Sequence, residues 1–238
     1  MSWILGVEGA SAVLSAGCVV VIGVFDGVHR GHQALLKQAC ERAQREGVPC
    51  VALTFDPHPS EVVRPQQPTP LLCPLAHRIE RLLQHGADLV VVQPFTEAFA
   101  RLAPEGFIQQ VLLDQLHARV VVVGEDFRFG HRQRGTVALL KQVGRFEVVA
   151  VPPVLDEAGE RIASTRIRQL VQAGMLEEAA QQLGEPLFWA GVVVRGESRG
   201  QTLGYPTANL VPLGRLIRPS EGVYAVLPCW TGGNTGQP

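Results

Sequence analysis

The fold is indicated most clearly by the stretch Gly23-Val24-Phe25-Asp26-Gly27-Val28-His29-Arg30-Gly31-His32. It follows directly after the apolar run Cys18–Ile22. It predicts a buried strand that ends at glycines and leads into a helix whose first residues carry two histidines. A helix N-terminus presents unpaired N–H groups and the positive end of the helix dipole, where anions bind. His29 and His32, three residues apart, share one helical face, and Gly31 leaves room for a nucleotide to approach the backbone. The stretch therefore predicts a site that holds and reacts nucleotide phosphates.

The composition narrows the classes of function. With 238 residues, of which 46% are hydrophobic and 18% charged, the chain can bury an ordinary core in one large domain, or in one domain plus a smaller one. The net charge of −1 gives no electrostatic support for nucleic-acid binding. The two lysines, Lys37 and Lys141, are each followed by glutamine, which excludes a Walker A loop. Histidine, arginine and backbone N–H groups must therefore hold any phosphate.

Neither a membrane span nor an export signal is expected. No run is apolar and long enough to cross a bilayer, and the apolar start from Met1 to Phe25 contains no basic residue. The cysteines form no C-x-x-C pair, as expected for buried thiols in a reducing compartment. They are Cys18, Cys40, Cys50, Cys73 and Cys229. We therefore expect a cytoplasmic protein.

The first two-thirds of the chain alternates apolar strands with segments of helical period. The predicted strands are Cys18–Phe25, Cys50–Phe55, Asp88–Phe95, Arg119–Gly124 and Phe146–Val151. The predicted helices are His32–Gly47, Leu75–Gly86, Pro104–His117 and Gly135–Gly144. This alternation predicts an α/β fold with a parallel sheet covered on both faces. Ligands of such sheets bind beyond the carboxyl ends of the strands.

That rule brings further motifs to the same end of the sheet. Asp56-Pro57-His58-Pro59 follows the second predicted strand, and Glu125-Asp126-Phe127-Arg128-Phe129-Gly130 follows the fourth. The segment from Arg161 to Arg168 opens another helix, with Ser164 or Thr165 expected as its N-cap. Thr165 and Arg168 are three residues apart and share one face of that helix, whereas Arg166 points away.

The alternation of strands and helices ends near Gly184-Glu185-Pro186, where extended and glycine-rich segments begin. We expect one domain over residues 1–183 and the start of a β domain over residues 184–238. Thr207 and Asn209 lie two apart in an extended segment and so project to one face.

Five motifs in this order closely resemble the bacterial bifunctional riboflavin kinase/FAD synthetase family. They read G-x-F-D-G-x-H-x-G-H, F-D-P-H-P, G-x-D-F-R-F-G, S-T-R-I-R and L-G-Y-P-T-A-N, and the match spans roughly Val19 to Val226. The resemblance implies an N-terminal FMN adenylyltransferase domain of Rossmann-like fold, followed by a riboflavin kinase β-barrel. ATP with Mg²⁺, FMN and riboflavin would be the ligands. The sequence leaves the oligomeric state open.

In the implied adenylylation the FMN phosphate attacks the α-phosphorus of ATP, so alignment and charge neutralisation matter more than a strong base. His29, His32 and Arg168 are the candidate catalytic residues. The candidate ATP-binding residues are Gly23, Phe25, Asp26, Gly31, Arg161, Ser164 and Thr165.

The candidate flavin-binding residues are Asp56, His58, Asp126, Phe127 and Phe129. A rigid turn explains His58 equally well. Asp126 could hold Mg²⁺ or accept a hydrogen bond from the substrate, and the resemblance favours the hydrogen bond. Phe127 and Phe129 could stack on a flavin ring or simply pack inward, and we expect one of the two, Phe129, to face the flavin.

In the second domain, the resemblance implies that Gly196 and Gly200 belong to an ATP flap and that Thr207 and Asn209 ligate Mg²⁺. An alcohol nucleophile needs a general base, which in this family is a glutamate on a later strand. After Asn209 this chain has one acidic residue, Glu221, which matches no catalytic position. We therefore expect a truncated or frameshifted barrel and kinase activity that is absent or very low.

Two other functions are compatible with these residues. The same histidine pair could serve a nucleotidyltransferase with a different acceptor, which ATP turnover dependent on FMN would distinguish. The chain could also be a non-catalytic flavin or nucleotide binder, which would release no pyrophosphate.

Overall fold

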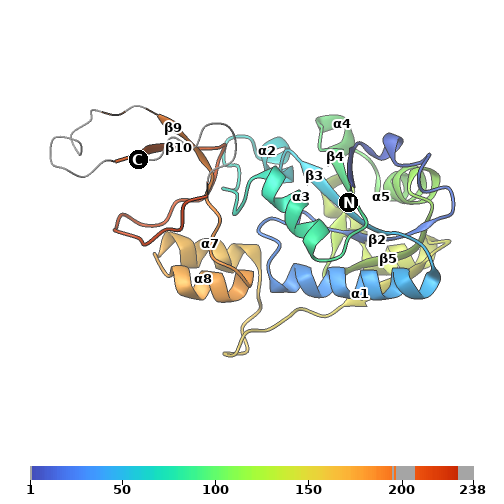
Figure 1. Cartoon of the computed structure of the whole chain (residues 1–238). Coiled ribbons are helices and arrows are strands. Elements are labelled where there is room, and N and C mark those ends of the chain that lie inside the picture. The colour runs from blue at the N-terminus through green and yellow to red at the C-terminus, as the bar shows by residue number, and fades with distance from the viewer. Residues whose placement is uncertain (1, 195, 197–206, 230–238) are drawn as a thin grey trace.

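The computed structural model of the chain describes residues 2–194, 196 and 207–229 (Figure 1). Its centre is a six-stranded sheet in which all neighbouring strands are parallel. The strands are β1 (Ser2–Leu5), β2 (Cys18–Ile22), β3 (Cys50–Asp56), β4 (Leu89–Pro94), β5 (Ala118–Gly124) and β8 (Glu147–Val151). Runs of β-branched valine favour strands buried on both faces, and every residue of β2 is buried. The predicted α/β fold with a parallel sheet is confirmed.

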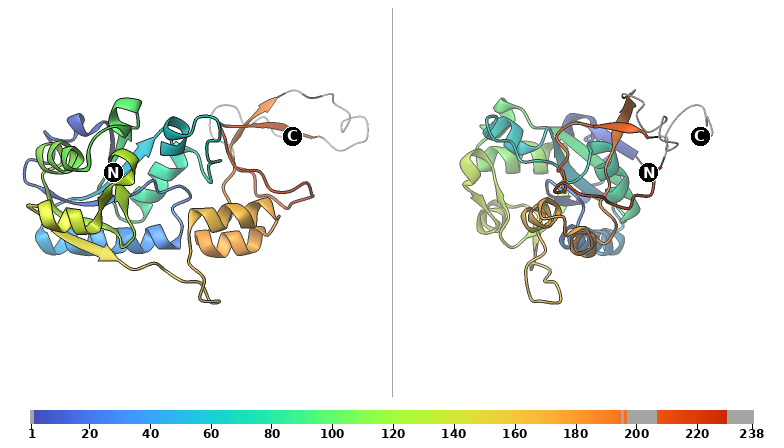
Figure 2. Two further views of the ribbon diagram at one scale, coloured as in Figure 1. Left: turned by 180° about the vertical axis from the view of Figure 1, so that it is seen from behind. Right: turned by 90° about the vertical axis from the view of Figure 1, so that its left-hand side faces the viewer.

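Helices cover both faces of this sheet (Figures 1 and 2). The helices α1 (Arg30–Glu46) and α3 (Leu75–Gln84) pack on one face, where Leu36 and Leu82 share a core with Val21 of β2. On the other face lie α5 (Pro104–Gly106), the π-helix η2 (Phe107–Gln115) and α6 (Val137–Val143), around a core that includes Val20. Neighbouring residues of β2 therefore point into two separate cores.

The strand order β1-β4-β3-β2-β5-β8 reverses beside β2. The chain builds β2, β3 and β4 toward one edge and then crosses back to place β5 on the other side of β2. The carboxyl ends of β2 and β5 therefore border a topological switch point, where open α/β sheets bind their ligands.

Most predicted elements are present, with differences at their ends. The strand β1 was not predicted, although it pairs with β4 at the sheet edge. The helix expected over Gly135–Gly144 starts at Val137, because Gly135 and Thr136 form the short strand β7, which pairs with β6 (Arg128–Phe129). The predicted helix from Pro104 is present as α5 and η2.

Two further regions follow the sheet. In the described part of the expected β domain, β9 (Gly191–Val194) and β10 (Asn209–Pro212) form an antiparallel pair. The helices α7 (Ser164–Gln172) and α8 (Leu176–Leu183) pack together through Ile167 and Leu183 and lie beside one end of α1 (Figures 1 and 2). The short elements are η1 (Val7–Gly9), α2 (Pro59–Val63), α4 (Glu97–Ala100) and η3 (His131–Gln133). Among the described helices, none has the length and apolarity that crossing a membrane would require.

Candidate active site

The candidate site lies at the loop that connects β2 to α1, at the topological switch point of the sheet. The connecting loop turns sharply, with positive φ angles at Phe25 (53°), Gly27 (81°) and Val28 (39°). Phe25 and Val28 are nevertheless fully buried, so core packing holds the strained backbone in place. This turn sets His29 at the N-cap of α1.

His29 is a buried N-cap whose side chain has a defined hydrogen-bonding role. Its Nδ1 accepts a hydrogen bond from the backbone N–H of His32 at 3.4 Å. A neutral imidazole that accepts at Nδ1 carries its proton on Nε2, which is then free to donate. Burial, together with the positive charges of Arg168 and Arg161, lowers the pKa of His29 to about 4. His29 is therefore a neutral donor at physiological pH.

His32 stacks on His29 and is also held neutral. The two ring centroids are 3.6 Å apart with an interplanar angle of 20°, and the Phe25 ring meets His32 edge-on at 5.2 Å. Burial lowers the pKa of His32 well below its ordinary value, and the charges of His29 and Arg78 lower it further. Its Nδ1 is buried and has no hydrogen-bond partner among the described residues. The predicted pairing of the two imidazoles is thus present.

Gly31 lies close to neighbouring residues of the protein. A Cβ at this position would lie 3.1 Å from the His29 ring and 3.4 Å from the carbonyl oxygen of Ile162. The space that a side chain would fill is therefore occupied by the protein itself, and glycine permits the stacked geometry of the histidines.

Asp26 organises the loop around the site. This carboxylate is 1% exposed. It accepts hydrogen bonds from the backbone N–H groups of Leu72 (2.9 and 3.1 Å) and Cys73 (3.4 Å) and forms an ion pair with Arg168. The Nε of Arg168 also donates to the carbonyl oxygen of Pro70 at 2.7 Å. Asp26 and Arg168, which the sequence assigned to ATP binding and catalysis, are thus bound to each other.

The start of α7 corrects one prediction. Neither Ser164 nor Thr165 is the N-cap; Ala163 occupies that position without a side-chain hydrogen bond. The Oγ of Ser164 instead donates to the backbone carbonyl of Asp26 at 3.0 Å, because α7 lies against the loop that follows β2. Thr165 is exposed. The hydroxyl of Ser164 therefore fixes α7 to the site.

Asp126 and Arg161 form an ion pair after β5. The Arg161 Nη1 lies 2.6 Å from the Asp126 Oδ2, with side chains 52% and 62% exposed. The hydrogen bond from Arg161 lowers the pKa of Asp126, and the same bond raises the pKa of Arg161. Exposed pairs of this kind contribute little stability, so an anionic ligand can compete for the arginine.

His58 caps the short helix α2. Its Nδ1 accepts a hydrogen bond from the N–H of Ser60 at 3.1 Å, and Glu61 accepts from the N–H of His58 in return. Burial lowers the pKa of His58. Burial also raises the pKa of the adjacent Asp56, although the charge of Arg78 opposes that shift. The rigid-turn interpretation of His58 is thus realised in the structure.

The two phenylalanines after β5 differ in burial. Phe129 is 7% exposed and packs in the core against Phe107, at a ring-centroid distance of 5.4 Å. Phe127 is only partly buried and stacks on Phe129 at 5.6 Å. The core thus takes up most of the Phe129 ring and leaves Phe127 nearer the surface.

Arg78 is a residue near the site that the sequence motifs did not indicate. It is fully buried on α3 and donates to the carbonyl oxygen of Phe55 at 2.8 Å and to the Oγ1 of Thr54 at 3.4 Å. Its Nε and Nη2 have no partner among the described residues. Its charge acts on His32 and Asp56. The one feature of the sequence that could have indicated Arg78 is its position on the apolar face of a helix, alongside Ile79 and Leu82.

The candidate residues of the second region are less enclosed. Thr207, Asn209 and Gly196 are exposed, and Asn209 pairs with Val194 in the β9–β10 ladder. Gly200 lies outside the described residues. Over the described ranges, no group of three or more His, Cys, Asp or Glu side chains is arranged to hold a metal ion.

Comparisons with known proteins agree on both regions. A family model described as FAD synthetase matches residues 12–166, and one described as riboflavin kinase matches residues 183–235. The bifunctional riboflavin kinase/FMN adenylyltransferase of Escherichia coli is 38% identical over 95% of this chain and 72% of its own length. The protein of the same name from Listeria monocytogenes is 41% identical over 87% of this chain and 67% of its own length.

A solved structure is also similar over most of the chain. A crystal structure described as a macrolide-efflux protein from Streptococcus pneumoniae has a TM-score of 0.82 and 36% sequence identity. The match covers 93% of this chain and 73% of that one.

Proposed function

The chain belongs to the family of bifunctional riboflavin kinase/FMN adenylyltransferases, and we propose that its β2–α1 site transfers AMP from ATP to FMN, giving FAD and pyrophosphate. One observation carries the assignment of the site. His29 and His32 are stacked, neutral and placed at the N-terminus of α1, at the switch point of a parallel sheet. Such a position suits the phosphates of a nucleotide.

The chemistry requires alignment rather than proton removal. An oxygen of the FMN phosphate forms a bond to the α-phosphorus of ATP while the bond from that phosphorus to the bridging oxygen of pyrophosphate breaks. The nucleophile is already an anion, so no general base is needed. The Nε2–H of His29 and the free N–H groups of α1 donate to phosphate oxygens as negative charge develops. His32 holds the same phosphates from the next turn of the helix.

The arginines complete the anion site from the other side. Arg161 leaves the exposed carboxylate of Asp126 to bind the triphosphate, a low-cost exchange for a surface ion pair. Asp126 is then free to accept a hydrogen bond from the flavin. Arg168 remains with Asp26, so it acts by holding α7 and Thr165 over the phosphates and by adding positive charge near His29.

The flavin contact is assigned to Phe127, whose ring is the more exposed of the two after β5. Mg²⁺ enters bound to ATP. At the β2–α1 site Asp26 stays paired with Arg168 and Asp126 is assigned to the flavin, so the triphosphate supplies most of the ligands of the ion. When bound, Mg²⁺ offsets the charge of the phosphates. We place the reaction in the cytoplasm, in line with the scattered unpaired cysteines.

The second region is a candidate riboflavin kinase, favoured by the family match over residues 183–235. Thr207 and Asn209 supply hydroxyl and amide oxygens, ligand types that suit Mg²⁺ carried by ATP. Because both residues are exposed, the nucleotide would contribute most of that metal site.

A two-substrate assay tests the adenylyltransferase. ATP is supplied with FMN or with riboflavin in separate reactions, and FAD and pyrophosphate are measured. We expect both products with FMN, and we expect His32→Ala to lower turnover by roughly 10²-fold or more, the scale of losing a preorganised donor. His85→Ala is the matched control, because the His85 side chain forms a hydrogen bond with Arg81 and lies away from the site.

Near-normal FAD production by His32→Ala would remove that histidine from the mechanism. Turnover of ATP with another acceptor but not with FMN would favour a different nucleotidyltransferase. Flavin binding without pyrophosphate release would favour a non-catalytic binder.

A further inference from the structure

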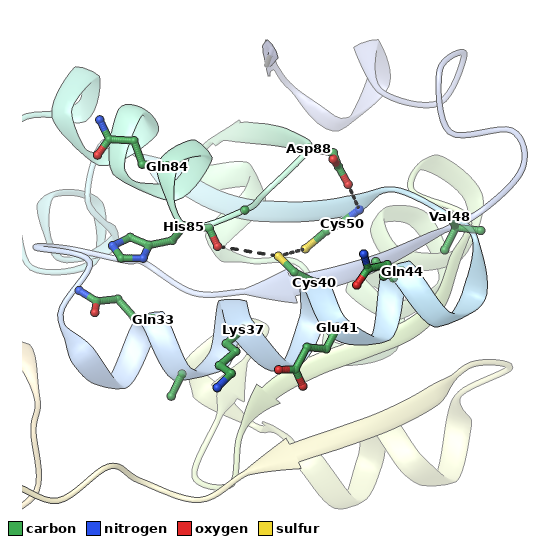
Figure 3. A pocket seen from close by; sticks show the side chains of 13 residues that line it. Gln33, Lys37, Cys40, Glu41, Gln44, Val48, Cys50, Gln84, His85 and Asp88 are labelled. Atoms are coloured by element: carbon green, nitrogen blue, oxygen red, sulfur yellow. Dashed lines mark hydrogen bonds between the residues drawn. The ribbon is translucent and has the colours of Figure 1, made fainter.

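A second site lies along α1, away from the histidines. A cleft of about 780 Å³ runs between α1, the start of β3 and the turn that joins α3 to β4 (Figure 3). Cys40 points into it from α1, and Cys50 meets Cys40 from the first position of β3. Cys40 lies eight residues beyond His32, which is about 12 Å along the helix axis. Cys40 is therefore well separated from the phosphate site, although the cleft itself extends as far as Gln33, next to His32.

The two sulfur atoms are in direct contact. Cys40 Sγ and Cys50 Sγ are 2.9 Å apart, so about 0.9 Å of approach brings them to bonding distance. Both cysteines are reduced in the structure. Residues from separate elements hold them in this position: Asp88 accepts a hydrogen bond from the N–H of Cys50 at 2.8 Å, and Gly86 lies against the Cys40 side chain.

The pair is also chemically asymmetric. The hydrogen bond from Cys50 lowers the pKa of the Cys40 thiol, although burial and the carboxylates of Asp88 and Glu41 oppose the shift. Cys50 is almost fully buried, whereas Cys40 is partly exposed in the cleft. A small reagent therefore reaches Cys40 first, and Cys50 is placed behind it as a resolving thiol.

The other cysteines lack this arrangement. The Cys18 thiol donates to the carbonyl oxygen of Leu116, and the Cys73 sulfur accepts from the N–H of Gly27. Burial raises the pKa of both thiols to about 12. Cys229 is exposed. In the described part of the chain, Cys40 and Cys50 are the only cysteines whose sulfur atoms contact each other.

We propose that Cys40 and Cys50 are a modification site, at which a hydroperoxide entering the cleft converts the two thiols into a reversible disulfide. The Cys40 thiolate attacks one oxygen of the peroxide and the O–O bond breaks, giving a sulfenic acid; with hydrogen peroxide, the hydroxide that leaves takes up the proton released by the Cys40 thiol and becomes water. The sulfur of Cys50 then attacks Cys40 Sγ, the S–S bond forms, and the hydroxyl leaves as a second water with the proton of Cys50. The two sulfur atoms together lose two electrons, and the peroxide gains them. A thiol reductant reverses the change.

Peptide mapping of the full chain tests this proposal. The protein is treated with a small excess of hydrogen peroxide, its remaining thiols are alkylated, and it is digested with trypsin without reduction. Cleavage after Lys37, Arg42 and Arg45 places the two cysteines on different peptides. We expect a cross-linked peptide pair two hydrogens lighter than the sum of the free peptides, assigned to Cys50 rather than Cys73 by fragmentation and lost on treatment with dithiothreitol.

Two variants sharpen the test. Cys229→Ser should keep the cross-link, because Cys229 is not part of the pair, whereas Cys40→Ser should abolish it. Recovery of Cys40 and Cys50 as separate alkylated peptides, under conditions that oxidise Cys229, would overturn the proposal. A cross-link from Cys40 to Cys73 or Cys229 would overturn it equally.

Discussion

At the scale of single residues, the site depends on two imidazoles that remain uncharged. His29 has to be neutral at Nδ1 to accept from the N–H of His32 and so to cap α1. Burial and the neighbouring arginines provide this neutrality by lowering the pKa of His29 to about 4. The same residue therefore links helix capping, stability and phosphate binding.

This link gives a pH prediction for His29. An unfolded histidine titrates near about pH 6.5, so between that pH and pH 4 the unfolded chain binds a proton that the folded chain does not. The free energy of unfolding should therefore fall as the pH is lowered through this window, with roughly 2 to 3 kcal/mol from this residue by pH 4.5.

Denaturant unfolding at pH 7 and pH 4.5 measures that loss. His29→Asn is the matched variant, because asparagine can also cap a helix but does not titrate. It should lose less stability than the natural chain over the same interval. An equal loss in both proteins would show that His29 is not the group responsible.

At the scale of elements, α7 and the loop after β2 act as one unit. The loop holds Asp26, and α7 contributes Arg168 and Ser164, which bind the carboxylate and the backbone of that same residue. Asp26 also fixes Leu72 and Cys73, which precede α3. One buried carboxylate therefore joins three segments that are far apart in sequence.

Arg168→Met should accordingly cost both stability and activity. Removing one partner leaves a buried charge uncompensated, which typically costs about 3 to 5 kcal/mol, and α7 would lose its position over the phosphates. Arg166→Met is the control, since Arg166 is exposed on the same helix. Unfolding free energies and FAD formation are measured for both variants.

The double variant Asp26→Asn with Arg168→Met should regain part of the lost stability, because it removes both charges. If Arg168→Met and Arg166→Met were equally stable, the ion pair would not hold the unit together.

The sequence predicted the elements better than the contacts between them. Valine-rich runs and helix-ending glycines predicted five of the six strands of the parallel sheet, because these signals are local. The edge strand β1 was missed, since its short segment Ser2–Leu5 shows no alternation of its own. Ser164 was expected to cap α7 because its position suited a cap, but the carbonyl of Asp26, 138 residues away in sequence, binds its hydroxyl instead.

In the candidate site, too, the local features could be predicted from the sequence, whereas the contacts between distant segments could not. The pairing of His29 with His32 followed from their spacing on one helix. The burial of Phe129 could not be predicted, because it depends on Phe107 filling the core beside it. The partners of Arg78, at Thr54 and Phe55, come from a strand more than 20 residues earlier and carry no motif.

At the scale of the whole molecule, the two regions differ in how much apolar surface they bury. The sheet region encloses two cores, one on each face of β2. In the described part of the second region, Val192 and Val211 of the β9–β10 pair are more than half exposed. The adenylyltransferase site therefore rests on the better packed part of the chain.

We expect this chain to phosphorylate riboflavin at least about 10²-fold more slowly than it adenylylates FMN. The transfer to riboflavin needs a base for the alcohol, a contribution of about 10² or more. Among the described residues after Asn209, the one carboxylate is that of Glu221, which is exposed to solvent rather than set in a site. Labelled ATP with riboflavin, followed by separation of FMN, measures this rate. Comparable rates with the two flavins would contradict the expectation.

The guanidinium buried beneath the histidines has one more consequence. Arg78 is fully buried on α3, shielded from salt and solvent, and its charge acts on His32. A phosphate group bound at the proposed site would therefore meet a positive potential whose source is shielded from the ionic medium. Two uncharged rings can then guide an anionic substrate, because the positive potential comes from the layer below them.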